Sequence, residues 1–329
     1  MGDFLSGYVF FTDICRPENQ PALKKDKLIG AFAISLAAAF WGVDGVVLTP
    51  RLYDLQSVAF VVFVIHALAF LIMNTFLFGE YGALKRFSMN DLLTFMLIAL
   101  FGGAMGTMAI VHALFLVNFE KLSIVILLQK LQPIFAIALA VIFLGERMRR
   151  HYFIWAGLAI AAGYFLTFGA GLPNFDTGDN TFEAALFSLL AAFSFGISTV
   201  LSKKILGKYS FHTATFYRYG FTSLIMLLFV LSTGLYFKFA EVTPVHWLIF
   251  LIIAVSTGSG AIFLYYYGLK KVRAVIATIC ELMFPVTAVI LDHIINGQRL
   301  TWVQWISALI MIYAIIRLNI TNSRQQYRK

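Results

Sequence analysis

Residues 122–147 read LSIVILLQKLQPIFAIALAVIFLGER, and this stretch decides the fold. Its apolar part, 122–143, is long enough to cross the hydrocarbon core of a bilayer as a helix, which takes about 20 residues. Residues 274–299, AVIATICELMFPVTAVILDHIINGQR, repeat a proline, a glycine and an arginine 152 positions later. Two spanning helices with proline, glycine and arginine at matching positions predict a membrane protein built from two related halves.

The similarity between the two stretches continues beyond them. Aligning 122–162 with 274–314 gives 11 identities in 41 positions, and LAA followed by glycine occurs in both 36–42 and 190–196. Three matches involve residues other than the common apolar ones: Pro133 with Pro285, Gly145 with Gly297 and Arg147 with Arg299. These matches indicate an internal repeat.

Hydropathy divides the whole chain into ten such apolar runs. They lie near 28–49, 56–78, 92–116, 122–143, 152–169, 182–202, 213–232, 246–268, 274–295 and 302–319. Each run has the length of one transmembrane helix. The sequence therefore predicts an all-α integral membrane protein with ten transmembrane helices.

The repeat assigns five helices to each half. Because five is odd, the second half enters the membrane in the opposite orientation, which makes the halves inverted repeats. We expect a tail over 1–27, a first five-helix repeat over 28–170, a second over 181–319 and a tail over 320–329.

The composition excludes most other classes of protein. Hydrophobic residues make up 60% of the chain, charged residues only 12%, and the mean hydropathy is +0.85, so an ordinary soluble enzyme is excluded. Two cysteines are too few for a disulfide framework or a metal motif. No metalloprotease or serine-hydrolase motif is present, so we expect no enzymatic activity, cofactor or metal.

The net charge of +9 reflects topology rather than nucleic-acid binding. With the N-terminus inside, 19 lysines and arginines fall in the tails and inner loops, and 4 fall in outer loops. This asymmetry follows the positive-inside rule and predicts that both termini are cytoplasmic.

These features resemble the drug/metabolite transporter superfamily, in its EamA-type group. The resemblance covers about 28–319 and rests on the ten-helix repeat, the helical prolines and three short elements: Phe40-Trp41-Gly42, Leu144-Gly145-Glu146-Arg147 and Asn296-Gly297-Gln298-Arg299. It implies an inner-membrane carrier whose substrate site lies between the two halves.

We therefore expect a secondary-active transporter of small organic metabolites, with amino acids and drugs as candidate exported substrates. It would work by alternating access around a midplane site, in the cytoplasmic membrane, as a monomer or homodimer. Its partners are a small-molecule substrate and the lipid bilayer, without nucleic acid. The alternative is a non-transporting membrane scaffold or sensor whose buried charges are structural.

Ionisable residues at membrane depth are the candidate site residues, because burying them there is costly. Lys130, flanked by Gln129 and Gln132, and Glu281 occupy nearly equivalent places in the two halves. We expect them to bind opposite ends of a zwitterionic substrate, or to form a structural salt bridge with each other.

Further candidates come from other helices. Arg218, Trp41 and Tyr265 complete the predicted substrate-binding set together with His66. Arg218 lies near a helix end, close enough to the interface to snorkel, so packing or snorkelling is the alternative to substrate contact for this residue. The candidate proton-coupling groups are Glu281, His66 and Asp44, since a carboxylate or an imidazole can take up a proton.

Overall fold

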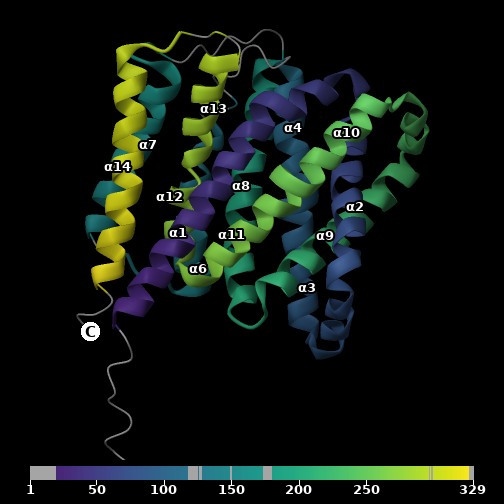
Figure 1. The fold of residues 1–329 in the computed structure, drawn as a ribbon, viewed down its shortest axis with the longest axis horizontal. Helices are drawn as coiled ribbons and strands as arrows, with labels where there is room; N and C mark the ends of the chain where they lie inside the picture. The colour runs from purple at the N-terminus through teal and green to yellow at the C-terminus, as the bar shows by residue number, and fades with distance from the viewer. Residues whose placement is uncertain are drawn as a thin grey trace, which may run out of the picture.

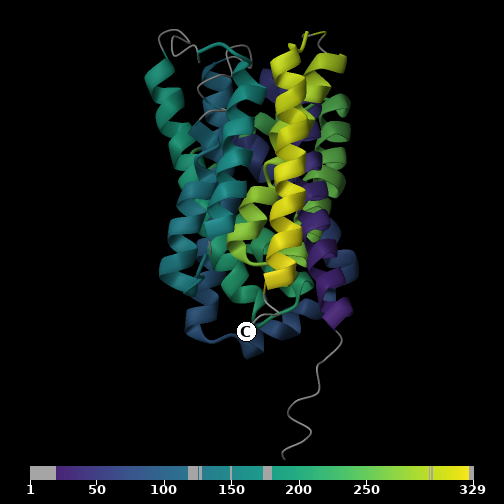
Figure 2. The same cartoon turned by 90° about the vertical axis from the view of Figure 1, so that its left-hand side faces the viewer.

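The chain folds as a bundle of long helices (Figures 1 and 2). The computed structural model describes residues 20–117, 125, 128–148, 150–172, 180–295, 297 and 299–325, and these contain helices and turns but no strand. Nine helical segments in this part are long and apolar enough to cross a membrane, and a tenth apolar helix, Gln132–Leu144, is shorter. The predicted all-α membrane fold is confirmed.

The first half of the described chain contains six α-helices. They are α1 (Gln20–Val43), α2 (Val58–Leu77), α3 (Met89–Ile98), α4 (Gly106–Leu116), α6 (Gln132–Leu144) and α7 (Arg150–Phe168). Short π-helical or 3₁₀ segments extend them: η1 (Asp44–Leu48), η2 (Thr49–Leu55), η3 (Phe78–Arg86) and η4 (Ala99–Met105). Together α3, η4 and α4 form one span.

The second half repeats this plan. Its helices are α8 (Thr181–Leu206), α9 (Phe211–Ser232), α10 (Pro244–Ile253), α11 (Ser259–Lys271), α12 (Ala274–Cys280), α13 (Met283–Ile295) and α14 (Trp302–Gln325). The segments η5 (Leu235–Glu241) and η6 (Ala254–Gly258) complete it. Here α10, η6 and α11 form the span that corresponds to α3, η4 and α4.

These two equivalent spans begin with the same local device. Ser88 caps α3 in a capping box with Asp91, and Thr243 caps α10 in a capping box with His246. Each cap satisfies backbone amides that the first turn of a helix leaves free. Both spans also contain a π-helical segment at mid-length, η4 and η6, so the repeat is visible in the backbone as well as in the sequence.

Helix packing follows the pattern expected for inverted repeats, in which a contact between the two halves occurs twice, with the roles of the halves exchanged. The contact of α1 with α11 corresponds to that of α8 with α4, and the contact of α1 with α13 corresponds to that of α8 with α6. The pairs α2–α9 and α7–α14 join equivalent helices of the two halves (Figure 1). Helix α1 begins and α14 ends at the same end of the bundle, which we call the termini side.

Two helices extend beyond their predicted spans. Helix α1 begins at Gln20 rather than near residue 28, and α14 continues to Gln325 rather than ending near 319. Hydropathy marks only the part of a helix that lies in hydrocarbon, whereas backbone hydrogen bonding continues through the polar residues that follow.

Candidate functional site

The fourth span of each half is broken next to its proline. The helical conformation is interrupted at Lys130-Leu131, just before α6, and at Glu281-Leu282, between α12 and α13. Proline has no amide hydrogen to continue the helical ladder. Both breaks therefore occur beside the two charged residues that the sequence singled out, at equivalent positions of the repeat.

A cavity of about 270 Å³ lies between the two halves and contacts both breaks. All nine predicted site residues line it: Trp41, Asp44, His66, Gln129, Lys130, Gln132, Arg218, Tyr265 and Glu281. Its lining extends from Thr278 in α12 to Thr49 and Leu114, near the helix ends opposite the termini side.

Lys130 and Glu281 line the same cavity but have different partners. The ammonium group of Lys130 donates to the Gly163 carbonyl and the Thr167 hydroxyl of α7. The Glu281 carboxylate accepts one hydrogen bond from Tyr265, at 2.6 Å, and another from the Gln132 amide. The direct salt bridge considered as an alternative is therefore not the arrangement in this structure.

The Glu281 carboxylate belongs to a hydrogen-bonded chain that joins the two halves. Gln132 comes from the first half, while Tyr265 and Thr199 come from α11 and α8 of the second. The Tyr265 hydroxyl also lies 2.8 Å from Thr199 Oγ1. Tyr265 is buried and its ring lies 5.4 Å from that of Trp41, so it faces the cavity.

Arg218 is buried rather than snorkelled. Its side chain is only 8% exposed, and it donates to the Tyr266 hydroxyl at 3.1 Å and to the Gly102 carbonyl at 2.9 Å. Tyr266 in turn contacts Ser202 of α8 at 2.7 Å. Of the alternatives for Arg218, snorkelling to the interface is not the arrangement in this structure, because helix α9 turns this position toward the protein interior, where neutral oxygens accept its hydrogen bonds.

His66 is also an interior residue. Its Nδ1 lies 2.8 Å from the Val62 carbonyl, which only accepts, so this nitrogen carries the hydrogen. The imidazole lies against Tyr219, with 5.2 Å between the ring centroids.

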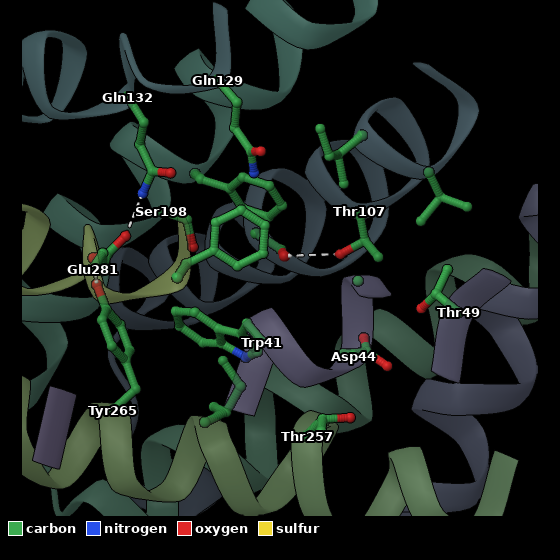
Figure 3. A pocket seen from close by; sticks show the side chains of 18 of the residues that line it. Trp41, Asp44, Thr49, Thr107, Gln129, Gln132, Ser198, Thr257, Tyr265 and Glu281 are labelled. Carbon is green, nitrogen blue, oxygen red and sulfur yellow. Dashed lines mark hydrogen bonds between the residues drawn. The ribbon is translucent and has the colours of Figure 1, made fainter. Parts of the chain in front are cut away.

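Asp44 lies at the first residue of the π-helical segment η1, beside Thr49 and Thr257. Figure 3 shows these three side chains at one end of the cavity, with Gln129, Gln132 and Glu281 at another and Trp41 between them. Thr257 lies in η6, so π-helical segments from both halves contribute to this end. Such segments in helices frequently occur at functional sites.

Some lining residues were missed by the sequence analysis. They are small hydroxyl residues or apolar aromatics, including Thr49, Thr107, Phe195, Ser198, Thr257 and Phe284. Residues of these types recur along the whole chain, so composition and periodicity do not single them out. The only available signal was their equivalence across the repeat, as with Gly102-Gly103 and Thr257-Gly258.

Comparison with known proteins identifies the family to which this chain belongs. The model of the EamA-like transporter family matches residues 28–168 and 183–320. The chain is 51% identical over 295 residues to the riboflavin transporter ImpX of Fusobacterium nucleatum subsp. nucleatum, which covers 89% of this chain and 98% of the relative. A crystal structure with 16% identity covers 92% of this chain and 98% of its own, with a TM-score of 0.62, and supports the fold alone. This protein is a multi-pass membrane transporter that belongs to the EamA-like transporter family.

Proposed function

We propose that this transporter carries riboflavin, or a closely related flavin, across the cytoplasmic membrane by alternating access. The observation that carries the proposal is the 51% identity to a riboflavin transporter along 89% of the chain. At that identity the two chains share one fold, so a shared substrate is the simplest expectation.

The character of the cavity supports a flavin. A flavin has a flat tricyclic ring, which needs aromatic or apolar walls. One end of the ring is a polar pyrimidinedione, and in riboflavin a polar ribityl chain extends from a nitrogen of the central ring. Aromatic lining comes from Trp41, Phe195 and Phe284, and amide and hydroxyl groups lie beyond them. Apolar walls with a few placed polar groups are typical of small-molecule sites.

Lys130 and Glu281 each hydrogen-bond to neutral residues of the protein, so part of their hydrogen-bonding capacity is already used in this structure. Flavin transport replaces amino-acid or drug export as our preferred function because of the identity to a riboflavin transporter. A scaffold or sensor would not need a central cavity lined by both halves.

Energy coupling and orientation complete the proposal. We propose a cytoplasmic location for both termini, from the distribution of lysine and arginine, and proton coupling through Glu281, His66 or Asp44. The cavity lies within one chain, so each subunit has its own site whether the carrier is a monomer or a homodimer.

The test is uptake of riboflavin by proteoliposomes that contain the purified protein, with unlabelled flavins, amino acids and a cationic drug as competitors. We expect saturable uptake that lumiflavin and excess riboflavin inhibit and that the other compounds leave unchanged. Empty liposomes provide the control. Inhibition by amino acids without inhibition by flavins would instead support the zwitterion hypothesis.

A further inference from the structure

The cavity has two polar ends of different chemistry. The first, which we call the amide end, consists of Gln129, Gln132, Glu281 and Tyr265. The second, which we call the hydroxyl end, consists of Asp44, Thr49 and Thr257. Trp41 lies between the two ends (Figure 3). The ring of Phe284 also lines the cavity, 3.7 Å from the position that a Cβ atom on Gly45 would take.

Polar atoms without partners concentrate around this cavity. In the described part of the chain, five buried side-chain nitrogen or oxygen atoms lack a hydrogen bond, and four belong to cavity residues: Asp44 Oδ1, Ser198 Oγ, Arg218 Nε and Thr257 Oγ1. Leaving a buried polar atom unpaired is unfavourable. Two of these atoms, on Asp44 and Thr257, lie at the hydroxyl end, so this end has hydrogen-bonding capacity that the described residues do not use.

The amide end also has free hydrogen-bonding capacity. The Gln129 side chain makes no hydrogen bond to any residue that the structure describes, and Gln132 uses only one amide hydrogen, toward Glu281. A glutamine amide offers a donor and an acceptor side by side. This pattern complements the pyrimidinedione edge of a flavin, where an N–H group lies between two carbonyl oxygens.

The hydroxyl end complements the ribityl chain of the same molecule. Asp44 Oδ1 as a carboxylate oxygen only accepts, so it repels the flavin carbonyls but accepts from the hydroxyls of the ribityl chain. The Thr257 hydroxyl both donates and accepts, as sugar hydroxyls do. The reverse orientation would place flavin carbonyls against the carboxylate.

We propose that the cavity binds riboflavin lengthwise, with its pyrimidinedione edge at Gln129 and Gln132 and its ribityl hydroxyls at Asp44 and Thr257. This inference rests on the proposed flavin transport and assigns the recognition of each end of the substrate. Asp44 then determines the selection of ribityl-bearing flavins over flavins that lack this chain.

The experiment compares the affinities of riboflavin and of lumiflavin, which carries a methyl group in place of the ribityl chain. Dissociation constants are measured by quenching of flavin fluorescence on purified protein. The variants are Asp44→Ala, Thr257→Val and Gln129→Leu. Ser256→Ala is the matched control, because Ser256 precedes Thr257 in the same segment, donates to the Ile252 carbonyl and does not line the cavity.

The expected result is a different pattern for each end. Asp44→Ala weakens riboflavin binding ~10–100-fold, the effect of losing hydrogen bonds to a charged group, and leaves lumiflavin binding unchanged. Thr257→Val acts in the same direction by ~3–10-fold, so the result does not depend on one variant folding. Gln129→Leu weakens both ligands by the same factor, and Ser256→Ala changes neither.

The outcomes separate this inference from the proposed function. If the wild-type protein binds neither flavin, the proposed function fails. If it binds both flavins but Asp44→Ala and Thr257→Val weaken them equally or not at all, the lengthwise orientation is overturned while flavin binding remains.

Discussion

At the scale of single residues, Glu281 is the acidic group whose hydrogen bonds join the two halves at the cavity. Each of its carboxylate oxygens accepts one hydrogen bond, from Tyr265 and from Gln132. Glutamine at this position preserves the shape and, after rotation of the Gln132 amide, both hydrogen bonds. We therefore expect Glu281→Gln to unfold near the wild-type temperature while the proposed flavin transport loses its dependence on pH.

The measurement combines thermal unfolding in detergent with flavin uptake at several external pH values. Glu281→Ala is the companion variant, since it leaves two donors unpaired and should lose about 1–3 kcal/mol of stability. A Glu281→Gln protein that retained the wild-type pH profile would place proton coupling at His66 or Asp44 instead.

Residue identity predicted the site well where the residues are ionisable. An ionisable group cannot face hydrocarbon cheaply, so Lys130, Glu281 and Arg218 had to face the interior or an end of the bundle. The partners of these groups were not predictable. Lys130 bonds to Thr167 of α7, a contact across 37 positions that depends on how the two helices pack.

At the scale of secondary structure, the prolines predicted where two spans break, whereas the π-helical segments left no clear signal. A proline removes a specific backbone hydrogen bond, so the position of the resulting helix break can be predicted from the sequence. A π-helical segment such as η1 or η6 needs only one extra residue in a turn, which ordinary apolar sequence accommodates. The hydroxyl end, built on these segments, was therefore predicted only through Asp44.

Close packing of α1 on α11 depends on glycine at the crossing. A Cβ atom on Gly268 would lie 2.3 Å from the Gly30 carbonyl oxygen and 2.7 Å from Ile34 Cγ1, so the two helices would have to separate. We expect Gly268→Ala to lower the unfolding free energy by about 1–3 kcal/mol, the usual cost of overpacking.

Gly157→Ala is the control for this prediction. Gly157 also lies within a helix, α7, but has no atom within 4 Å of its potential Cβ position. Alanine there removes the conformational cost of glycine, so stability should stay constant or rise by about 0.5–1 kcal/mol. Equal losses for both variants in thermal unfolding would show that the effect does not depend on the close approach of the helices at the crossing.

At the scale of the whole molecule, the charge distribution predicts the orientation in the membrane. The α2–α3 connection carries the exposed residue Lys85 and lies on the termini side, while Glu241 ends the 3₁₀ segment η5 at the opposite side (Figure 1). Asp179, also predicted to be outside, lies beyond the described residues. In a background without Cys15 and Cys280, an impermeant maleimide should label cysteine at 179 or 241 in intact cells and spare cysteine at 85.

Reaction of cysteine at 85 with silence at 241 would invert the orientation. Permeabilised cells, in which every exposed position reacts, control for expression and reactivity. This outcome would reverse the sidedness of the cavity but leave the packing of the two halves unchanged.

The hydrogen bonds below the cavity predict how the carrier opens toward the termini side. Every residue of α12 is buried, and the first half holds this helix in place. Glu146 accepts from the amides of Ala274 and Val275 at 2.9 and 3.3 Å, and the Tyr152 hydroxyl donates to the Val275 carbonyl at 2.9 Å. For the substrate to leave by this side, α12 must separate from these two residues of the other half. Weakening their contacts should therefore favour the conformation that opens there.

Tyr152→Phe removes one of these contacts with no change in ring size, and Glu146→Ala removes two. A cysteine at Thr278, which lines the cavity from α12, reports access when an impermeant maleimide is added to one side of oriented vesicles. We expect labelling from the termini side to rise by about fivefold in Tyr152→Phe, which corresponds to the loss of one hydrogen bond of about 1 kcal/mol, and further in Glu146→Ala. Tyr164→Phe, on the same helix α7, is the matched control and should match the parent. An unchanged labelling rate in both variants would mean that the hydrogen bonds of Glu146 and Tyr152 to α12 do not hold the cavity closed.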